Sequence, residues 1–181
     1  MKPLAIVIPL RDFAAGKSRL RHAGVSDVGR RIEELATGVI TASQPRPTYV
    51  ACESPTVATF ARERGAGVIL SNAHDLNAAV TNAHRNLAGE FSVIMIVLGD
   101  LRNPAGLGTY EPPAPVSIVA DHHGTGTNVL VVPGDVEFNF SFGPDSARHH
   151  AEEAARLGLA CHVTRESVWA FDVDEIEDLG D

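Results

Sequence analysis

The 181-residue chain carries 15 Lys and Arg residues against 23 Asp and Glu residues, so its formal net charge at pH 7 is −8. An acidic chain of this kind is a poor partner for nucleic acid or an anionic membrane surface, although a local basic pocket can still hold a small anion. The apolar runs are too short to span a bilayer, and no signal-peptide core precedes Pro9. We therefore expect a single cytoplasmic domain over residues 1–181, without a nucleic-acid or membrane partner.

The first half of the chain alternates strand-like and helix-like segments. Strands are expected at residues 4–8, 49–52, 68–70 and 92–98, and helices at about 26–40, 55–64 and 75–88. The run at 92–98 contains six consecutive apolar residues, which is typical of a central strand buried on both faces. This order of elements predicts an α/β fold with a mostly parallel central sheet flanked by helices.

The second half is less regular. A Pro/Gly-rich connection at 104–115 precedes a strand at 116–120, and further extended segments are expected at 128–132, 138–142, 159–163 and 168–171. One helix is expected at about 144–157, with alanines on its inner face and Gly158 at its end.

Asp100 follows the most apolar strand directly, after Gly99. A carboxylate just past the end of a central parallel strand lies where open α/β sheets bind their ligands. The alternative is that Asp100 only turns the chain or caps the next segment. Both interpretations are open from this residue alone.

The loop after the first strand is strongly basic, with Arg11, Lys17, Arg19 and Arg21 within eleven positions. Its Gly16-Lys17-Ser18 ending is similar to the end of a phosphate-binding P-loop, but Arg11 stands where that motif requires its first glycine. Without that glycine the tight nest of backbone amides is lost, which argues against a Walker-type ATPase. A basic loop suited to triphosphate remains, although for Arg19 and Arg21 a solvated surface cluster is the better explanation.

The segment Asp172-Val173-Asp174 places two carboxylates two residues apart. In an extended chain such residues point to the same side, so both could bind one cation. The alternative is a helix cap, because Asp174 is followed three residues later by Glu177 in the pattern of a capping box.

Two further segments are rich in hydrogen-bond donors. Residues 121–128 alternate glycine and threonine after two histidines, so backbone amides and hydroxyls could approach an anion. Residues 142–146 begin a helix, and the free N–H groups there favour a phosphate or carboxylate. An ordinary turn and an ordinary N-cap are the alternatives, and we assign no role to His122 or His123.

Taken together, these segments resemble one family, the 2-phospho-L-lactate guanylyltransferases of deazaflavin coenzyme biosynthesis. The family belongs to the nucleotidyltransferases with a glycosyltransferase-A-like, Rossmann-like fold. The matching stretches occur in the family's order along the whole chain: 8–10 through 17–20, 75–79, 99–101, 124–128, 142–146 and 172–174.

The resemblance implies that a phosphate oxygen of a small phospho-acid attacks the α-phosphorus of GTP and that pyrophosphate leaves. It implies Mg²⁺ as cofactor, with Lys17 and Asp100 as catalytic residues. By the same resemblance, magnesium would be held by Asp100, Asp172 and Asp174, the nucleotide by Arg11, Lys17 and Asn77, and the acceptor by Thr127, Asn128, Gly143 and Ser146.

The chain departs from the family after Gly99-Asp100-Leu101, where Arg102-Asn103-Pro104 opens the Pro/Gly-rich connection in place of an immediate proline and short helix. This leaves phosphoenolpyruvate, 2-phospho-L-lactate and 3-phosphoglycerate as candidate acceptors. The rival hypothesis is a non-catalytic or divergent nucleotide-binding protein with the same fold. A homodimer is the assembly considered.

Overall fold

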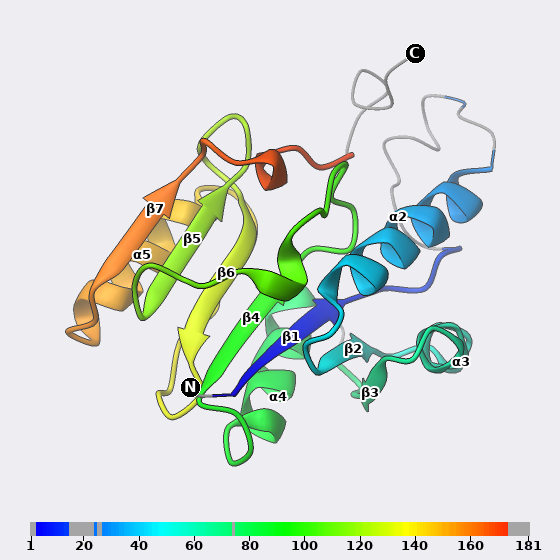
Figure 1. Cartoon of the computed structure of the whole chain (residues 1–181), viewed down its shortest axis with the longest axis horizontal. Coiled ribbons are helices and arrows are strands. Elements are labelled where there is room, and N and C mark those ends of the chain that lie inside the picture. The colour runs from blue at the N-terminus through cyan, green and yellow to red at the C-terminus, as the bar shows by residue number, and fades with distance from the viewer. Residues whose placement is uncertain (1–2, 15–23, 25–26, 74, 174–181) are drawn as a thin grey trace.

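The computed structural model describes residues 3–14, 24, 27–73 and 75–173. A seven-stranded sheet has helices on both faces (Figure 1), which confirms the predicted α/β architecture. The strands lie in the order β3-β2-β1-β4-β6-β5-β7. Their bounds are β1 Leu4–Pro9, β2 Thr48–Cys52, β3 Gly67–Leu70, β4 Val93–Val97, β5 Val116–Ala120, β6 Thr127–Pro133 and β7 Cys161–Thr164. The helices are α2 Val28–Ser43, α3 Pro55–Glu63, α4 Leu76–Leu87, α5 Ser146–Arg156, and the short 3₁₀ helices η1 Leu107–Thr109 and η2 Val168–Ala170.

The sheet is mostly parallel, as predicted, and β6 is the antiparallel member. A short turn joins β5 to β6, and a parallel neighbour would need a crossover of a dozen or more residues. The turn is closed by the chain itself, since Asp121 N donates to Gly126 O at 3.1 Å and Gly124 N donates to Asp121 O at 2.8 Å. Strand β4 therefore lies at the centre, between parallel β1 and antiparallel β6.

Strand β1 divides the core into two layers because successive side chains point to opposite faces. Leu4, Ile6 and Ile8 pack in one cluster with residues of α2 and α3. Ala5 and Val7 pack in the other cluster with residues of α4 and α5. Each face of the sheet is thus covered by two helices, which explains why its strands are nearly continuously apolar.

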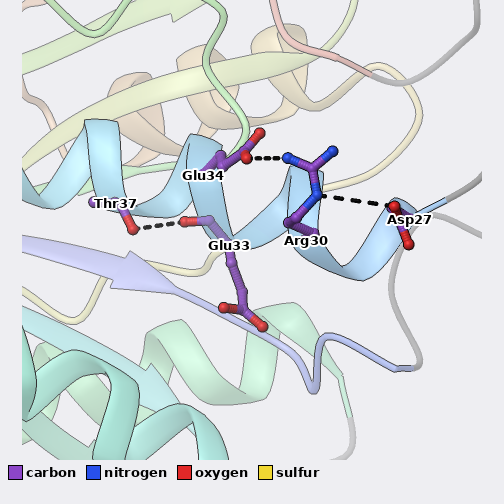
Figure 2. Close-up of polar contacts among 5 residues, drawn as sticks. All are labelled: Asp27, Arg30, Glu33, Glu34 and Thr37. Carbon is purple, nitrogen blue, oxygen red and sulfur yellow. Dashed lines mark hydrogen bonds and ion pairs between the residues drawn. The ribbon is translucent and has the colours of Figure 1, made fainter.

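The outer face of α2 is held by short-range polar contacts (Figure 2). Arg30 forms an ion pair with Glu34 one turn later and approaches Asp27 at 3.9 Å. Thr37 Oγ1 donates to Glu33 O at 2.7 Å. Exposed pairs of this type contribute about 0.3–0.5 kcal/mol each, so α2 is stabilised mainly by its buried face.

One segment expected to be extended lies outside the sheet, and one segment predicted as a strand has another structure. The extended segment 138–142 lies outside the seven-stranded sheet, and residues 168–170 form the 3₁₀ helix η2. In the first case, alternating apolar residues do bury one side, since Phe138 and Phe140 are in the core, but side chains of two helices bind the backbone instead of a strand. In the second, Ser167 Oγ accepts a hydrogen bond from Trp169 N at 3.2 Å and caps a short helix.

Candidate functional site

The two described acids of the predicted metal site lie on adjacent segments. Leu101 forms an isolated antiparallel bridge with Asp172, Val173 N donates to Asp100 O at 3.1 Å, and Arg102 N donates to Phe171 O at 2.8 Å. These bonds bring Asp100, at the end of the central strand, beside the C-terminal segment that carries Asp172. Both acids are half-buried. The structure thus brings these two residues into one region, whereas their binding of a shared metal ion stays a prediction.

Asp174, the third acid of that prediction, and Lys17, predicted to be catalytic and to bind the nucleotide, lie outside the described residues. Among the described ranges, no group of three or more His, Cys, Asp or Glu side chains is arranged to hold a metal ion. Arg11 is described, and it is exposed directly after β1, at the start of the basic loop.

Asp12, which the sequence reasoning missed, anchors the start of that loop. Its carboxylate accepts hydrogen bonds from Ser54 Oγ at 2.8 Å and from Ala14 N at 2.9 Å. The bond from Ser54, followed by the bond from Ala14, lowers the pKa of Asp12 below its usual value. The chain is therefore tied to the start of α3 directly after Arg11. In the sequence, the only feature that indicated a role for Asp12 was the position of an acidic residue within a basic run.

Asn128 was predicted to bind the acceptor, and here its side chain supports Asp172. The amide is buried, and its Nδ2 donates to Trp169 O at 2.9 Å and to Asp172 Oδ1 at 3.3 Å. Because Nδ2 carries two protons, both are used in these two bonds. Asn128 thus orients one of the predicted metal-binding carboxylates, which is a role that sequence reasoning did not assign.

The predicted acceptor residues Thr127 and Ser146 meet in the core. They come from β6 and from the first residue of α5, and Ser146 Oγ donates to Thr127 Oγ1 at 3.1 Å. Both side chains are almost fully buried, with exposed fractions of 3% and 1%. Gly143, at a φ of +126°, precedes this helix, and Ser146 N donates to its carbonyl at 3.2 Å. The two donor-rich segments of the sequence are therefore one cluster in space.

The glycine-threonine turn itself does not present the amides that the sequence indicated. Thr125 N donates to Asp121 Oδ1 at 2.8 Å and Gly124 N donates to Asp121 O. A Cβ at Gly126 would lie 2.6 Å from the Asp121 carboxylate, so a larger residue there would displace that side chain. Thr125 N thus binds a carboxylate of the chain itself and Gly124 N binds a backbone carbonyl, so the expectation of an anion site in this turn is wrong for these two amides.

His150 is a further residue of this cluster that the sequence reasoning missed. Its ring is completely buried, with Nδ1 3.1 Å from Thr127 Oγ1 and Nε2 3.0 Å from Ser141 N. Burial, followed by the neighbouring charge of His149, lowers the pKa of His150 to about 4. The available signal was spacing, because a residue four positions after Ser146 lies on the same face of α5.

Asn77 was predicted to contact the nucleotide, and here its amide binds the backbone of Phe142. Its Oδ1 accepts from Phe142 N at 2.6 Å and its Nδ2 donates to Phe142 O at 3.1 Å. Asp75 caps the same helix by accepting from Ala78 N at 2.8 Å, as expected for the start of α4. Asn77 therefore links α4 to the segment 138–142, and its contact with the nucleotide stays a prediction.

The Pro/Gly-rich connection 104–115 is packed against the molecule. Trp169 Nε1 donates to Ala105 O at 2.9 Å, and the Trp169 ring lies edge-on to Tyr110 with centroids 4.9 Å apart. A Cβ at Gly108 would lie 2.0 Å from Gln44 O, so this glycine allows the connection to approach the end of α2. The segment 102–104, which departs from the family pattern, thus leads into a connection that packs against η2 and the end of α2.

Comparisons with known proteins show which proteins this chain is similar to. The profile of a family described as "Guanylyl transferase CofC like" matches residues 4–181. The chain is 31% identical to a phosphoenolpyruvate guanylyltransferase of Chloroflexus aurantiacus, over 97% of this chain and 92% of that protein. It is also 31% identical to the phosphoenolpyruvate guanylyltransferase of Mycolicibacterium smegmatis, over 97% of this chain and 82% of that protein.

Solved structures show the same fold at low sequence identity. A putative nucleotide-diphospho-sugar transferase from Desulfovibrio desulfuricans aligns with a TM-score of 0.72 at 11% identity, covering 99% of this chain and 85% of that one. A nucleotidyl transferase from Methanothermobacter aligns with a TM-score of 0.68 at 13% identity, covering 98% and 94%. These alignments confirm the predicted nucleotidyltransferase-like fold. No helix in the described part of the chain has both the length and the apolar composition to cross a membrane.

Proposed function

Because this chain belongs to the CofC-like guanylyl transferase family, we propose that it transfers the guanylyl group of GTP to the phosphate of a small phospho-acid. The chain is a nucleotidyltransferase, as the names of its relatives and its family indicate. In the proposed reaction an acceptor phosphate oxygen forms a bond to the α-phosphorus of GTP. The bond between that phosphorus and the oxygen bridging to the β-phosphate breaks, and pyrophosphate leaves with the electron pair.

The observation that supports this proposal most is the juxtaposition of Asp100 and Asp172 at the end of the central strand. Phosphoryl-type transfer depends on positioning and charge stabilisation rather than on a protein nucleophile. Carboxylate oxygens are the donors that Mg²⁺ prefers, so the residues present fit this ion. When bound, the ion would neutralise triphosphate charge and favour departure of pyrophosphate.

The chain's own residues supply the rest of the proposed site. Asn128 donates to Asp172 Oδ1 and thereby holds that carboxylate in one orientation. Arg11 and Lys17 provide positive charge in the loop after β1, where Asp12 anchors the chain. Thr127 and Ser146 provide hydroxyls, and Gly143 leaves open space, since a Cβ there would meet no atom within 4 Å. The proposed acceptor, a phospho-acid, carries both a phosphate and a carboxylate.

Phosphoenolpyruvate is the first acceptor to test, because relatives covering most of the chain carry that substrate in their names. The experiment measures pyrophosphate release from GTP and Mg²⁺ with phosphoenolpyruvate, 2-phospho-L-lactate or 3-phosphoglycerate, with ATP and CTP as nucleotide controls. We expect release only with GTP and one preferred acceptor. Equal turnover of the three nucleotides would refute guanine selectivity. An absence of release with every acceptor would favour a non-catalytic nucleotide-binding protein.

The acceptor assignment is tested separately with a Thr127→Val, Ser146→Ala double variant. This variant removes both hydroxyls and conserves the shape of the threonine side chain. We expect the KM for the acceptor to rise while the KM for GTP changes little, because the proposal assigns the pair to the acceptor and the basic residues to the nucleotide. Full activity of the double variant at low acceptor concentration would remove these residues from the acceptor site.

A further inference from the structure

His150 sits behind the Thr127–Ser146 hydroxyl pair and contacts it from the interior of the molecule. The ring lies between Thr127 Oγ1 and Ser141 N, and Phe142 packs edge-on against it with ring centroids 4.8 Å apart. Nothing in the proposed transfer step requires a histidine at this place. Its hydrogen bond to Thr127 instead affects which hydroxyl protons of the pair are available.

The hydrogen bonds determine which ring nitrogen carries the proton. A backbone N–H can only donate, so Ser141 N makes His150 Nε2 the acceptor. In a neutral imidazole the proton then resides on Nδ1, which must donate to Thr127 Oγ1. The ring is neutral at physiological pH because burial holds its pKa near 4, even though the Glu153 carboxylate opposes that shift. Arg156 in turn pairs with Glu153 and offsets its charge.

This tautomer determines how many hydroxyl protons of the Thr127–Ser146 pair remain free. The two hydroxyls carry two protons, and one is used in the bond between Ser146 Oγ and Thr127 Oγ1. His150 adds a donor and takes none, so whichever hydroxyl donates to the other, one hydroxyl proton remains for a ligand. With the opposite tautomer, Nδ1 would accept from Thr127, and both hydroxyl protons would be used inside the protein. Among the hydrogen bonds of the described residues, none uses the remaining proton.

We infer that His150 is a positioning residue that makes the Thr127–Ser146 pair a hydrogen-bond donor for the anionic group of the acceptor. This inference rests on the proposed function, because it takes the phospho-acid as the ligand of the pair. A donor aimed at an anion inside a low-dielectric, water-poor environment is stronger than one in water. The Nδ1–H tautomer is thus the feature of His150 that matters for binding.

Two substitutions separate the two contacts of the ring. In His150→Asn the shorter amide can place its Nδ2 near the Nδ1 position and still donate to Thr127. In His150→Gln the longer amide can place its Oε1 near the Nε2 position and accept from Ser141 N, but the donation to Thr127 is lost. His84→Gln is the matched control, because His84 is also buried but binds the Pro133 carbonyl, with Nε2 and that oxygen 2.9 Å apart.

The experiment measures steady-state KM values for phosphoenolpyruvate and GTP in each variant. We expect His150→Gln to raise the KM for phosphoenolpyruvate about tenfold and the KM for GTP less than about twofold, since Thr127 then lacks the donor that directs its hydroxyl proton toward the ligand, and the bond from the pair to the anion is weakened. His150→Asn and His84→Gln should stay within about threefold of wild type for both substrates. Equal increases in the Asn and Gln variants, or a parallel rise in both KM values, would refute the inference.

A measurement on the unmodified chain keeps the test independent of folding defects. The ¹⁵N resonances of His150 should show a protonated Nδ1 and an unprotonated Nε2 at neutral pH, and the reverse assignment would overturn the inference. A wild-type chain that transfers no guanylyl group would refute the proposed function together with the acceptor role of the pair. An active chain with an unchanged phosphoenolpyruvate KM in His150→Gln would refute only the inference about His150.

Discussion

Replacing Asn77 by alanine should release the segment 138–142 from α4. This segment has no partner strand in the described sheet, and its backbone N–H groups are bound by side chains: Asn139 N by Glu153 at 2.9 Å, Ser141 N by His150 at 3.0 Å, and Phe142 N by Asn77 at 2.6 Å. Asn77 also donates to Phe142 O at 3.1 Å. The variant therefore removes two of the bonds that hold the chain just before Gly143.

The expected loss of stability follows from those two bonds. A typical hydrogen bond contributes about 0.5–1.5 kcal/mol, and a half-buried amide left without its partner costs more. Asparagine to alanine inside a helix recovers about 0.5 kcal/mol of helix propensity. We therefore expect Asn77→Ala to lower the free energy of unfolding by about 1–3 kcal/mol. Asn77→Asp keeps an oxygen to accept from Phe142 N and should lose less.

Urea denaturation measures this change, and hydrogen exchange of the Phe142 amide localises it. The matched control is Asn86→Ala on the same helix, because the exposed Asn86 amide bonds only to Asn82 one turn earlier. That control should remain within about 0.5 kcal/mol of wild type. An Asn77→Ala chain with unchanged stability and unchanged protection of the Phe142 amide would refute the reasoning. A rise in the KM for GTP alone would assign Asn77 to the nucleotide.

Three further changes test other parts of the site. Asp172→Asn should abolish most guanylyl transfer and most of the stabilisation that Mg²⁺ gives wild type, with no loss of melting temperature in the absence of the ion; retained turnover would contradict the metal assignment. The Arg156 hydrogen bonds lower the pKa of Glu153 to about 2, so the stability from this carboxylate is present above about pH 4.5 and is lost as the pH falls through 2. Glu153→Gln should therefore flatten the acid side of a pH–stability curve, whereas the exposed Glu152→Gln should leave it unchanged. Trp169→Phe removes the indole N–H that donates to the Ala105 carbonyl and should lower the free energy of unfolding, measured by thermal unfolding, by about 1–2 kcal/mol. An unchanged stability would show that other contacts hold the Pro/Gly-rich connection 104–115.

Most elements of the fold could be predicted from patterns that act over short distances. The apolar run before Gly99 predicts a strand buried on both faces, and β4 is that strand. Asp75 before an amphipathic stretch predicts the start of α4, and its carboxylate caps that helix. Segment 138–142 alternates as a strand does, yet its backbone is bound by Asn77, Glu153 and His150. Those residues lie outside the segment, so the alternation of apolar residues alone could not distinguish this arrangement from a strand of the sheet.

The candidate site divides in the same way. The sequence by itself determined which acids, hydroxyls and basic residues are available and that Asp100 ends the central strand, because those features depend on residue type and on local spacing. Only the tertiary structure brought Asp172 beside Asp100, turned Asn128 toward Asp172, and joined Thr127 to Ser146 with His150 behind them. Each of these contacts joins residues from different strands, loops or helices. Their distances depend on how the sheet and helices pack, which no local pattern encodes.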